Sequence, residues 1–236
     1  MSKFADIYGH EQIKEHLQNA IRLNKVSHAY IFNGPMGSGK KMTAGIFAET
    51  LQCERHGQEP CGTCHSCIQS ESGNQPDIIW VHHEKPGSIG VDDVREQVIG
   101  DMQIKPYSSR YKIYIIDEAE KLTQQAQNAL LKTIEEPPAY GIIILLTTNA
   151  DTFLQTILSR CVRLDFRPLR DTLVTQYLQE KYDLTDYECR FATAFAQGKI
   201  GRAVTIATSK EFAQLKEEVM HVIRYAKEMT TAEIMA

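Results

Sequence analysis

The stretch Gly34-Pro-Met-Gly-Ser-Gly-Lys-Lys41 matches the phosphate-binding pattern G-x-x-x-x-G-K and decides the fold. A short apolar run at 30–32 precedes it, and a helix is predicted at 42–51 directly after it. This order of strand, loop and helix suits anion binding, because the first turn of a helix offers free N–H groups and the positive end of its dipole. The alternative is a plain glycine-rich turn, but the strand and the helix predicted on either side of the loop argue against it. The residues expected to cradle phosphates are Gly34, Gly37, Gly39, Lys40 and Lys41.

The last position of this pattern departs from the usual residue type. A phosphate-binding loop normally has Ser or Thr after its lysine, and the hydroxyl helps to hold Mg²⁺ beside the nucleotide. Here the position is Lys41. An ammonium group cannot ligate a cation and would repel one. We therefore expect a loop that holds phosphates but is poorly built to hydrolyse them.

Length and composition narrow the class of protein. The chain has 236 residues, which predicts one large or two smaller domains, and its 42% hydrophobic and 24% charged residues are typical of a soluble globular protein. The net charge of −4 argues against a protein that grips nucleic acid alone, but not against DNA contact shared with other subunits. No apolar signal segment opens the chain and no run reaches transmembrane length, so we expect a cytoplasmic location and no membrane partner.

Four of the six cysteines form the pattern Cys53-x7-Cys61-x2-Cys64-x2-Cys67. Four thiolates at this spacing suit a tetrahedral Zn²⁺ ion, and short polar turns between them can bring the sulfurs around one metal. With four protein ligands no open position remains for a substrate, so the predicted role is structural. Disulfide bonds and an iron–sulfur cluster are the alternatives. The neighbouring histidines are expected to be surface residues; they are His65, His82 and His83.

Two acids follow a second apolar strand candidate, Lys112–Ile116. In a parallel sheet the end of such a strand lies beside the phosphate loop, so Asp117 is placed to hold Mg²⁺ through water and Glu118 to polarise an attacking water. Acids are also common at helix starts, which is the alternative for this pair. The strand predicted at 142–148 ends at the same edge of the sheet and brings Thr148 there.

The pattern of apolar segments divides the chain into two parts. Strand candidates at 30–32, 77–81, 112–116, 142–148 and 162–166 alternate with helix candidates at 12–23, 42–51, 91–102, 122–136 and 152–158. This alternation predicts an α/β domain at 1–168, with a parallel sheet covered on both faces and a cysteine insert at 53–67. Beyond it, helical periodicity at 171–181, 185–196 and 210–227 predicts a small all-helical domain at 169–236.

Together these segments resemble the AAA+ subunits of the bacterial DNA polymerase III clamp loader. Besides the phosphate loop and the cysteine insert, the resemblance is carried by Ile115-Ile-Asp-Glu-Ala119, Asn128-Ala-Leu-Leu-Lys-Thr-Ile-Glu-Glu-Pro-Pro138 and Ser159-Arg160-Cys161, and it spans residues 4–208. It implies a P-loop AAA+ domain with a zinc-binding insert and a helical lid domain. It also implies membership of a hetero-pentameric ring with gamma/tau and delta subunits, which uses ATP to open the sliding clamp and place it on primed DNA.

The resemblance implies a role for Arg160 as an arginine finger that reaches the ATP of the next subunit. An exposed guanidinium is always charged and can stabilise the charge that develops on the γ-phosphate in trans. The alternative is an ordinary surface or ion-paired arginine. Family members also carry a third, collar domain, which we expect to be missing from this chain.

Two departures favour a subunit of the delta-prime type over the gamma/tau motor type. The first is Lys41, which replaces the hydroxyl on the magnesium side. The second concerns the pattern G-x-x-R-D-A, which motor subunits resemble: in this chain Gly201 occupies the position of its arginine, and Arg202 follows one residue later. Residual nucleotide binding remains open because the other site residues are present; these are Lys40, Asp117, Glu118 and Thr148. Hydrolysis needs every part in place, so we expect ATP and Mg²⁺ to be held poorly or not at all and Glu118 to be a weak or vestigial catalytic residue.

Two other functions remain open. One is an active, gamma/tau-like clamp-loader ATPase. The other is a P-loop nucleotide kinase, which would need an arginine-rich lid and a substrate pocket that the sequence does not reveal.

Overall fold

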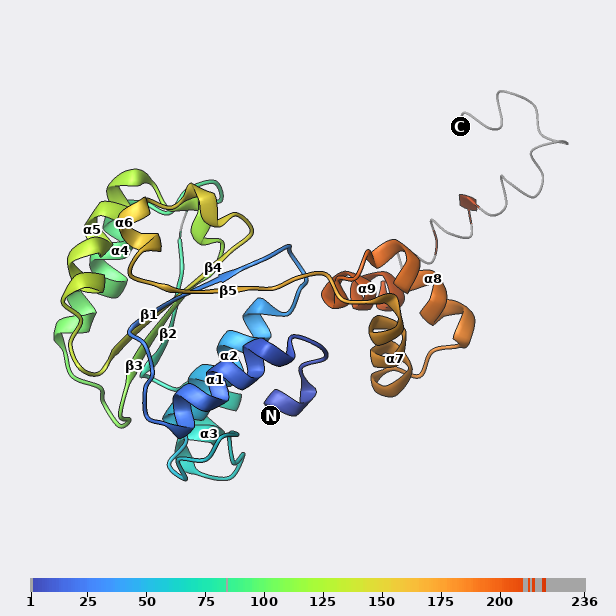
Figure 1. The fold of residues 1–236 in the computed structure, drawn as a ribbon, viewed down its shortest axis with the longest axis horizontal. Coiled ribbons are helices and arrows are strands. Elements are labelled where there is room, and N and C mark those ends of the chain that lie inside the picture. Colours follow the sequence, from blue (N-terminus) through green and yellow to red (C-terminus); the bar gives the residue numbers. More distant parts are fainter. Residues whose placement is uncertain (1, 84, 210–211, 213, 215–217, 220–236) are drawn as a thin grey trace, which may run out of the picture. The chain divides into compact units, whose positions relative to one another are not determined.

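A computed structural model describes residues 2–83, 85–209, 212, 214, 218 and 219 (Figure 1). Its contacts divide the chain into two compact units, with the division between Arg167 and Pro168. The first unit is an α/β layer structure and the second is helical. Within the described part of the chain, no helix combines the length and the apolar character that crossing a bilayer requires.

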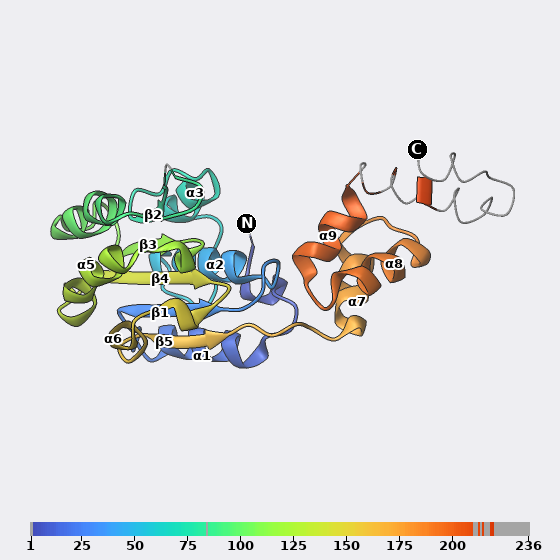
Figure 2. The ribbon, with the colours of Figure 1, turned by 90° about the horizontal axis from the view of Figure 1, so that it is seen from above.

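The first unit is built on one five-stranded sheet in the order β2-β3-β4-β1-β5, and every neighbouring pair is parallel (Figure 2). The strands are β1 (Ala29–Asn33), β2 (Ile78–Val81), β3 (Lys112–Ile116), β4 (Gly141–Thr147) and β5 (Val162–Asp165). The central strands β3 and β4 are buried along their whole length, as their unbroken apolar sequences predict for a sheet covered on both sides. The predicted parallel α/β fold is confirmed.

Helices cover both faces of the sheet (Figure 1). One face carries α1 (Glu11–Arg22) and α2 (Lys40–Gln52), with α3 (His65–Glu71) beside α2. The other face carries α4 (Val91–Val94), α5 (Gln124–Glu135) and α6 (Gln155–Leu158).

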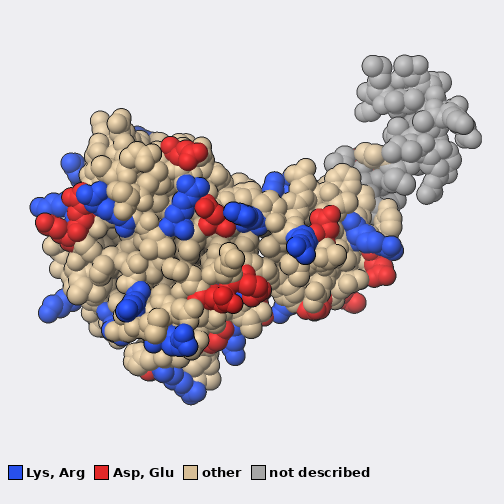
Figure 3. Space-filling model, viewed as in Figure 1, with Lys and Arg blue, Asp and Glu red and all other residues tan. Residues whose placement is uncertain are grey.

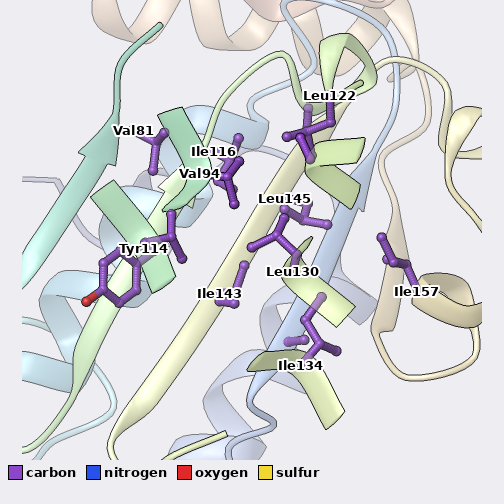
Figure 4. Close-up of a cluster of buried hydrophobic side chains, with 14 of the residues drawn as sticks. Val81, Val94, Tyr114, Ile116, Leu122, Leu130, Ile134, Ile143, Leu145 and Ile157 are labelled. Atoms are coloured by element: carbon purple, nitrogen blue, oxygen red, sulfur yellow. The ribbon is translucent and has the colours of Figure 1, made fainter. Parts of the chain in front are cut away.

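Successive strand residues contribute to two separate cores, because side chains alternate across a strand. On β3, Tyr114 and Ile116 pack with α4, α5 and α6 (Figure 4), whereas Ile113 and Ile115 pack with α1 and α2. Each core therefore holds its own helical layer against the sheet, and the loops that leave the strand ends rest on rigid supports.

Three predicted helices differ in detail. The segment predicted as a helix at 91–102 is α4 followed by a π-helix, η2 (Arg95–Gly100), and a 3-10 turn, η3 (Asp101–Gln103). The helix predicted from residue 122 begins at Gln124, because the Thr123 side chain caps it by accepting the Ala126 N–H at 3.2 Å. A 3-10 turn, η4 (Ala119–Lys121), precedes it. The last segment, at 152–158, is split into η5 (Ala150–Thr152) and α6.

The second unit contains α7 (Asp171–Lys181), α8 (Asp186–Ala196) and α9 (Ile200–Thr208) around a small core that includes Val174, Leu178 and Ala192. Gly198 makes the turn into α9 with φ +73°, and a Cβ there would lie 2.3 Å from the Leu169 carbonyl oxygen, so only glycine fits. The helix predicted at 210–227 falls largely outside the described residues.

Charges are mixed on the surface in view. Figure 3 shows lysine and arginine side chains scattered singly over the first unit, with acidic groups among them, on this face. Such a distribution agrees with the net charge of −4 and forms no continuous basic stripe on the side shown.

Candidate functional site

The phosphate loop leaves the end of β1 and enters α2 at Lys40. Gly34 has φ +156°, and a Cβ there would lie 2.4 Å from the Phe166 carbonyl oxygen, so the loop can pass β5 only with glycine. Gly39 has φ +94° and precedes the first turn of α2, where a Cβ would meet open space. The backbone thus keeps the first-turn N–H groups of α2 directed at an open site, which can take an anion.

Lys40 is folded back onto its own loop. Its ammonium group is buried, with the residue only 8% exposed, and it donates to the Gly34 carbonyl and, at 2.9 Å, to the Pro35 carbonyl. Burial lowers the pKa of Lys40, although the carboxylates of Glu120 and Asp117 oppose that shift. A phosphate would have to replace these carbonyl contacts.

Lys41 and Asp117 form an ion pair with 3.1 Å between Nζ and Oδ2. The same ammonium lies 5.2 Å from the centre of the Trp80 ring. Both partners are substantially exposed, with side chains 68% and 40% accessible. The cation therefore rests against the carboxylate that would otherwise be placed to hold Mg²⁺.

Glu118 is also paired with a cation. It has φ +51°, and its carboxylate accepts from Lys121 Nζ at 2.7 Å and lies 3.7 Å from His83 Nε2. A cavity of about 460 Å³ opens here, and its lining includes Lys41, Trp80, His82, His83, Asp117 and Glu118. His65 and His82 are exposed as predicted. His83 is only partly exposed, because it lines the cavity with 17% of its side chain accessible.

Thr148 lies at the predicted edge, but its partner was missed. Its hydroxyl donates to Glu120 Oε1 at 2.7 Å and its N–H donates to Oε2 at 3.2 Å. Burial raises the pKa of Glu120, yet the hydrogen bonds from Thr148, from the backbone of Glu120 and from the Thr147 side chain together outweigh burial and leave the pKa below its ordinary value. In the sequence, the only indication of this contact is that Glu120 is a third acid, two residues after Glu118.

His10 is a second residue near the loop that sequence reasoning missed. Its Nε2 lies 3.1 Å from the Ser38 carbonyl oxygen, and its ring is 4.8 Å from the Phe166 ring. Burial lowers the pKa of His10, which favours the neutral imidazole. No pattern in the sequence links a histidine before α1 to the loop.

The four clustered cysteines meet at one point, with their sulfur atoms within 4.8 Å of one another. Cys61 Sγ and Cys67 Sγ are 3.9 Å apart, close to the roughly 3.8 Å that separates two sulfurs bound to one tetrahedral zinc at about 2.3 Å. A disulfide would require about 2.05 Å, and all four thiols are free. The spacing fits a metal ion and contradicts a disulfide framework.

Backbone N–H groups surround these sulfurs. Cys61 Sγ accepts from the N–H groups of Thr63 and Cys64 at 3.5 and 3.3 Å, and the Thr63 N–H is the main reason that the pKa of Cys61 falls to about 5. Burial raises the pKa values of Cys53 and Cys67. A cation among the sulfurs would favour all four thiolates, as a metal site requires.

Arg160 lies at the other edge of the sheet from the phosphate loop. β5 begins at Val162, which pairs with Tyr30 near the start of β1, whereas the loop follows the end of β1 (Figure 1). The Arg160 side chain is 40% exposed, and its guanidinium contacts Glu135 Oε1 at 3.0 Å and donates to the Thr156 carbonyl at 3.0 Å. Arg160 therefore lies away from this chain's own loop and is accessible from outside.

The fold and these motifs match known proteins. Residues 9–170 match the family model described as DNA polymerase III, delta subunit. The chain is 38% identical over 210 residues to the tau/gamma subunit of DNA polymerase III from Haemophilus influenzae, covering 86% of this chain and 30% of that protein. It is 40% identical over 182 residues to the tau subunit from Bacillus subtilis (77% and 32% covered) and 34% identical over 205 residues to the delta-prime subunit from the same organism (86% and 61% covered).

Solved structures agree. A gamma-subunit-related protein of DNA polymerase III from Thermotoga maritima has a TM-score of 0.52 at 26% identity, covering 79% of this chain and 58% of that one. The RuvB branch migration motor from Thermotoga maritima, at 17% identity, shares the fold with a TM-score of 0.56 over 85% of this chain and 61% of its own. The chain thus has the P-loop AAA+ fold and spans between 30% and 61% of the length of the curated relatives named above. It belongs to the family of DNA polymerase III clamp-loader subunits that includes tau, gamma and delta-prime.

Proposed function

We propose that this chain acts as a delta-prime-like subunit of the clamp loader, which lends Arg160 to an ATP site on a neighbouring subunit and hydrolyses little or no ATP itself. The observation that carries the proposal is the position of Arg160, exposed on the sheet edge opposite its own phosphate loop. A guanidinium there can act only on a nucleotide bound by another chain. Its permanent charge suits the stabilisation of a γ-phosphate in the transition state.

The contact with Glu135 does not oppose this role. Ion pairs between exposed side chains contribute about 0–1 kcal/mol, and both partners here are at least 40% exposed. A phosphate group can therefore replace Glu135 as the partner of Arg160 at small cost. Until then, Glu135 and the Thr156 carbonyl keep the guanidinium in one orientation.

The weak hydrolysis proposed for this chain follows from Lys41. The hydroxyl that would bind Mg²⁺ is missing, and the ammonium that replaces it is paired with Asp117, the predicted magnesium ligand. Phosphoryl transfer depends on the metal, the acid and the loop being placed together, so the loss of one part disables the set. Glu118, held by Lys121, is the vestigial member of that set.

A gamma/tau-like ATPase is the second candidate. It is favoured by the 38–40% identity to tau-type relatives and by the presence of Lys40, Asp117, Glu118 and Thr148. The two functions differ in a simple measurement. Steady turnover of Mg-ATP by the isolated chain would select the motor, whereas a delta-prime-like subunit shows none above background.

The cysteine cluster is proposed to hold a structural zinc ion through Cys53, Cys61, Cys64 and Cys67. The sulfur spacing and the all-thiolate donor set support zinc, and four protein ligands leave no position for catalysis. Metal analysis of the purified chain tests this, with one zinc per chain expected.

The proposed assembly is a hetero-pentameric ring with gamma/tau and delta subunits, acting on the sliding clamp and primed DNA. In it, residues 1–168 form the AAA+ domain and residues from 169 onward form a helical lid. The mixed charges on the face in view support DNA contact through the complex rather than by this chain alone.

The decisive experiment is Arg160→Ala in a reconstituted loader. We expect ATP turnover to fall by about 10³-fold at the neighbouring site, because an arginine finger is worth about 10³–10⁵ in rate. Arg163→Ala is the matched control, since Arg163 is also exposed and ion-paired, with Asp165 at 2.9 Å. Equal turnover in the two variants, with intact assembly, would refute the role given to Arg160.

A further inference from the structure

The acids beside the phosphate loop already have positively charged or donating partners within the chain. Asp117 is paired with Lys41 at 3.1 Å, Glu118 with Lys121 at 2.7 Å, and Glu120 accepts two hydrogen bonds from Thr148. The positive charge on Lys41 also faces the Trp80 ring at 5.2 Å. At the edge of the site where a metal ion would be expected, two of the three acids are therefore paired with lysines and the third is hydrogen-bonded.

Magnesium does not fit this arrangement. Mg²⁺ needs near-octahedral oxygen ligands, and in phosphate-binding loops it takes one of them from the hydroxyl after the lysine. Lys41 removes that hydroxyl and brings an ammonium to the carboxylate that would be the next ligand. The Lys41 ammonium, 3.1 Å from Asp117 Oδ2, repels a second cation brought to this carboxylate.

The anion-binding part of the loop is nevertheless preserved. Gly34 and Gly39 keep the positive φ values that glycine adopts most readily, and the first turn of α2 is free to accept an anion. In the same loop Ser38 is only 7% exposed, and its buried hydroxyl has no hydrogen-bond partner among the described residues. A buried donor without a partner is costly unless a ligand satisfies it. The adjoining cavity of about 460 Å³ has room for phosphate groups beside Lys41.

We propose that this loop and cavity bind a metal-free nucleoside triphosphate, with the Lys41 ammonium as a built-in replacement for Mg²⁺. Lys41 is the second residue of α2, so its side chain leans toward the start of the helix, where the phosphates would lie. Its side chain is 68% exposed on a flexible stem and can leave Asp117 for a phosphate oxygen. The inference rests on the proposed function, because it explains how a subunit that does not hydrolyse ATP can still hold it.

The test is a titration of the full chain with ATP, in excess Mg²⁺ and in EDTA. Trp80 is the single tryptophan of the chain and lines the cavity, so its fluorescence reports binding directly, and calorimetry provides a second readout. We expect ATP to bind at least about tenfold more tightly in EDTA than in excess Mg²⁺, because Mg²⁺ draws ATP into a complex whose metal ion the Lys41 ammonium repels.

Variants at Lys41 sharpen the test. Lys41→Thr should make binding dependent on magnesium, with Kd at least about tenfold lower in Mg²⁺ than in EDTA, because it restores the hydroxyl ligand and frees Asp117. Lys41→Met removes the charge without adding a hydroxyl and should weaken binding in both conditions. Lys132→Thr is the matched control, an exposed lysine on α5 to which the same change is made, and should behave as the unmodified chain.

Two results would overturn the inference. One is a wild-type affinity that is equal in the two conditions or higher in Mg²⁺ than in EDTA. The other is the absence of binding in both conditions, by fluorescence and calorimetry alike. Neither touches the proposed function, since the contribution of Arg160 needs no nucleotide in this chain. Turnover of Mg-ATP by the isolated chain would instead refute the proposed function.

Discussion

Removal of metal from the cysteine cluster should destabilise the first unit without unfolding its sheet. The segment 53–67 is tied to the rest of the unit through Glu59, whose carboxylate accepts from the Phe4 N–H at 2.8 Å and from Gln18 Nε2 at 3.1 Å. Hydrogen bonds to a charged group contribute about 1.5–3 kcal/mol each, and these are only partly buried, so their loss should cost about 3 kcal/mol. That is a fraction of the typical 5–15 kcal/mol of a folded domain.

The expected size of the effect follows from the length of the unit. For a unit of this size, 1 kcal/mol shifts the melting temperature by about 2–4 °C, so chelation should lower it by about 6–12 °C. Hydrogen exchange followed by mass spectrometry should show lost protection at 53–71 and in the segment before α1. The strands β1, β3 and β4 should keep theirs, because their packing involves no cysteine of the cluster.

A matched variant separates the metal from the contacts that it supports. Glu59→Ala leaves the four cysteines in place but removes both hydrogen bonds, so it should retain its metal and still lose most of the same stability. The reasoning would be refuted if chelation removed protection from β3 and β4 together with the cysteine segment. It would also fail if Glu59→Ala melted at the temperature of the unmodified, metal-bound chain.

Three further predictions concern single residues. Asp77 is buried and accepts the N–H groups of residues 107–109 at 2.6, 2.9 and 3.0 Å, so Asp77→Ala should cost about 3–5 kcal/mol in urea denaturation, and Asp77→Asn clearly less. Burial raises the pKa of Glu120, but its hydrogen bonds, foremost those from Thr148, together lower it by more, and the net shift is downward. The ionised Glu120 carboxylate therefore contributes its full stability above about pH 4.3, the pKa of a glutamate in the unfolded chain. This contribution is lost as the pH falls through the lower pKa that Glu120 has in the folded chain. In the Glu120→Gln variant the midpoint of urea unfolding should fall less as the pH is lowered than it does in the unmodified chain. An unchanged dependence on pH would show that another group causes the loss. A Cβ added at Gly39 meets no atom within 4 Å, but an alanine there must keep φ +94°. Gly39→Ala should therefore lower the free energy of unfolding by about 1–2 kcal/mol through backbone strain alone, as measured by thermal unfolding.

The core of the fold could be predicted because its signals are local. Unbroken apolar runs such as 142–146 predict buried parallel strands, and the glycines of the phosphate loop mark a backbone that only glycine adopts. The irregular helix at 91–103 could not be predicted, since its sequence has ordinary helical periodicity. Its π-helical part lies where Val98 is buried between the sheet and α5, and packing decides how the backbone winds there.

The sequence by itself determined the strand–loop–helix motif, the cysteine spacing and the departure at Lys41, because each depends on residues that are neighbours along the chain. Only the tertiary structure decided which groups meet Lys41 and Thr148. Those contacts join ends of strands that are far apart in sequence, and they exist because β4 lies between β3 and β1 in the sheet. The parallel pairing of β5 with β1 also separates Arg160 from its own phosphate loop, since in a parallel sheet the residues before a strand and the residues after a strand lie at opposite edges.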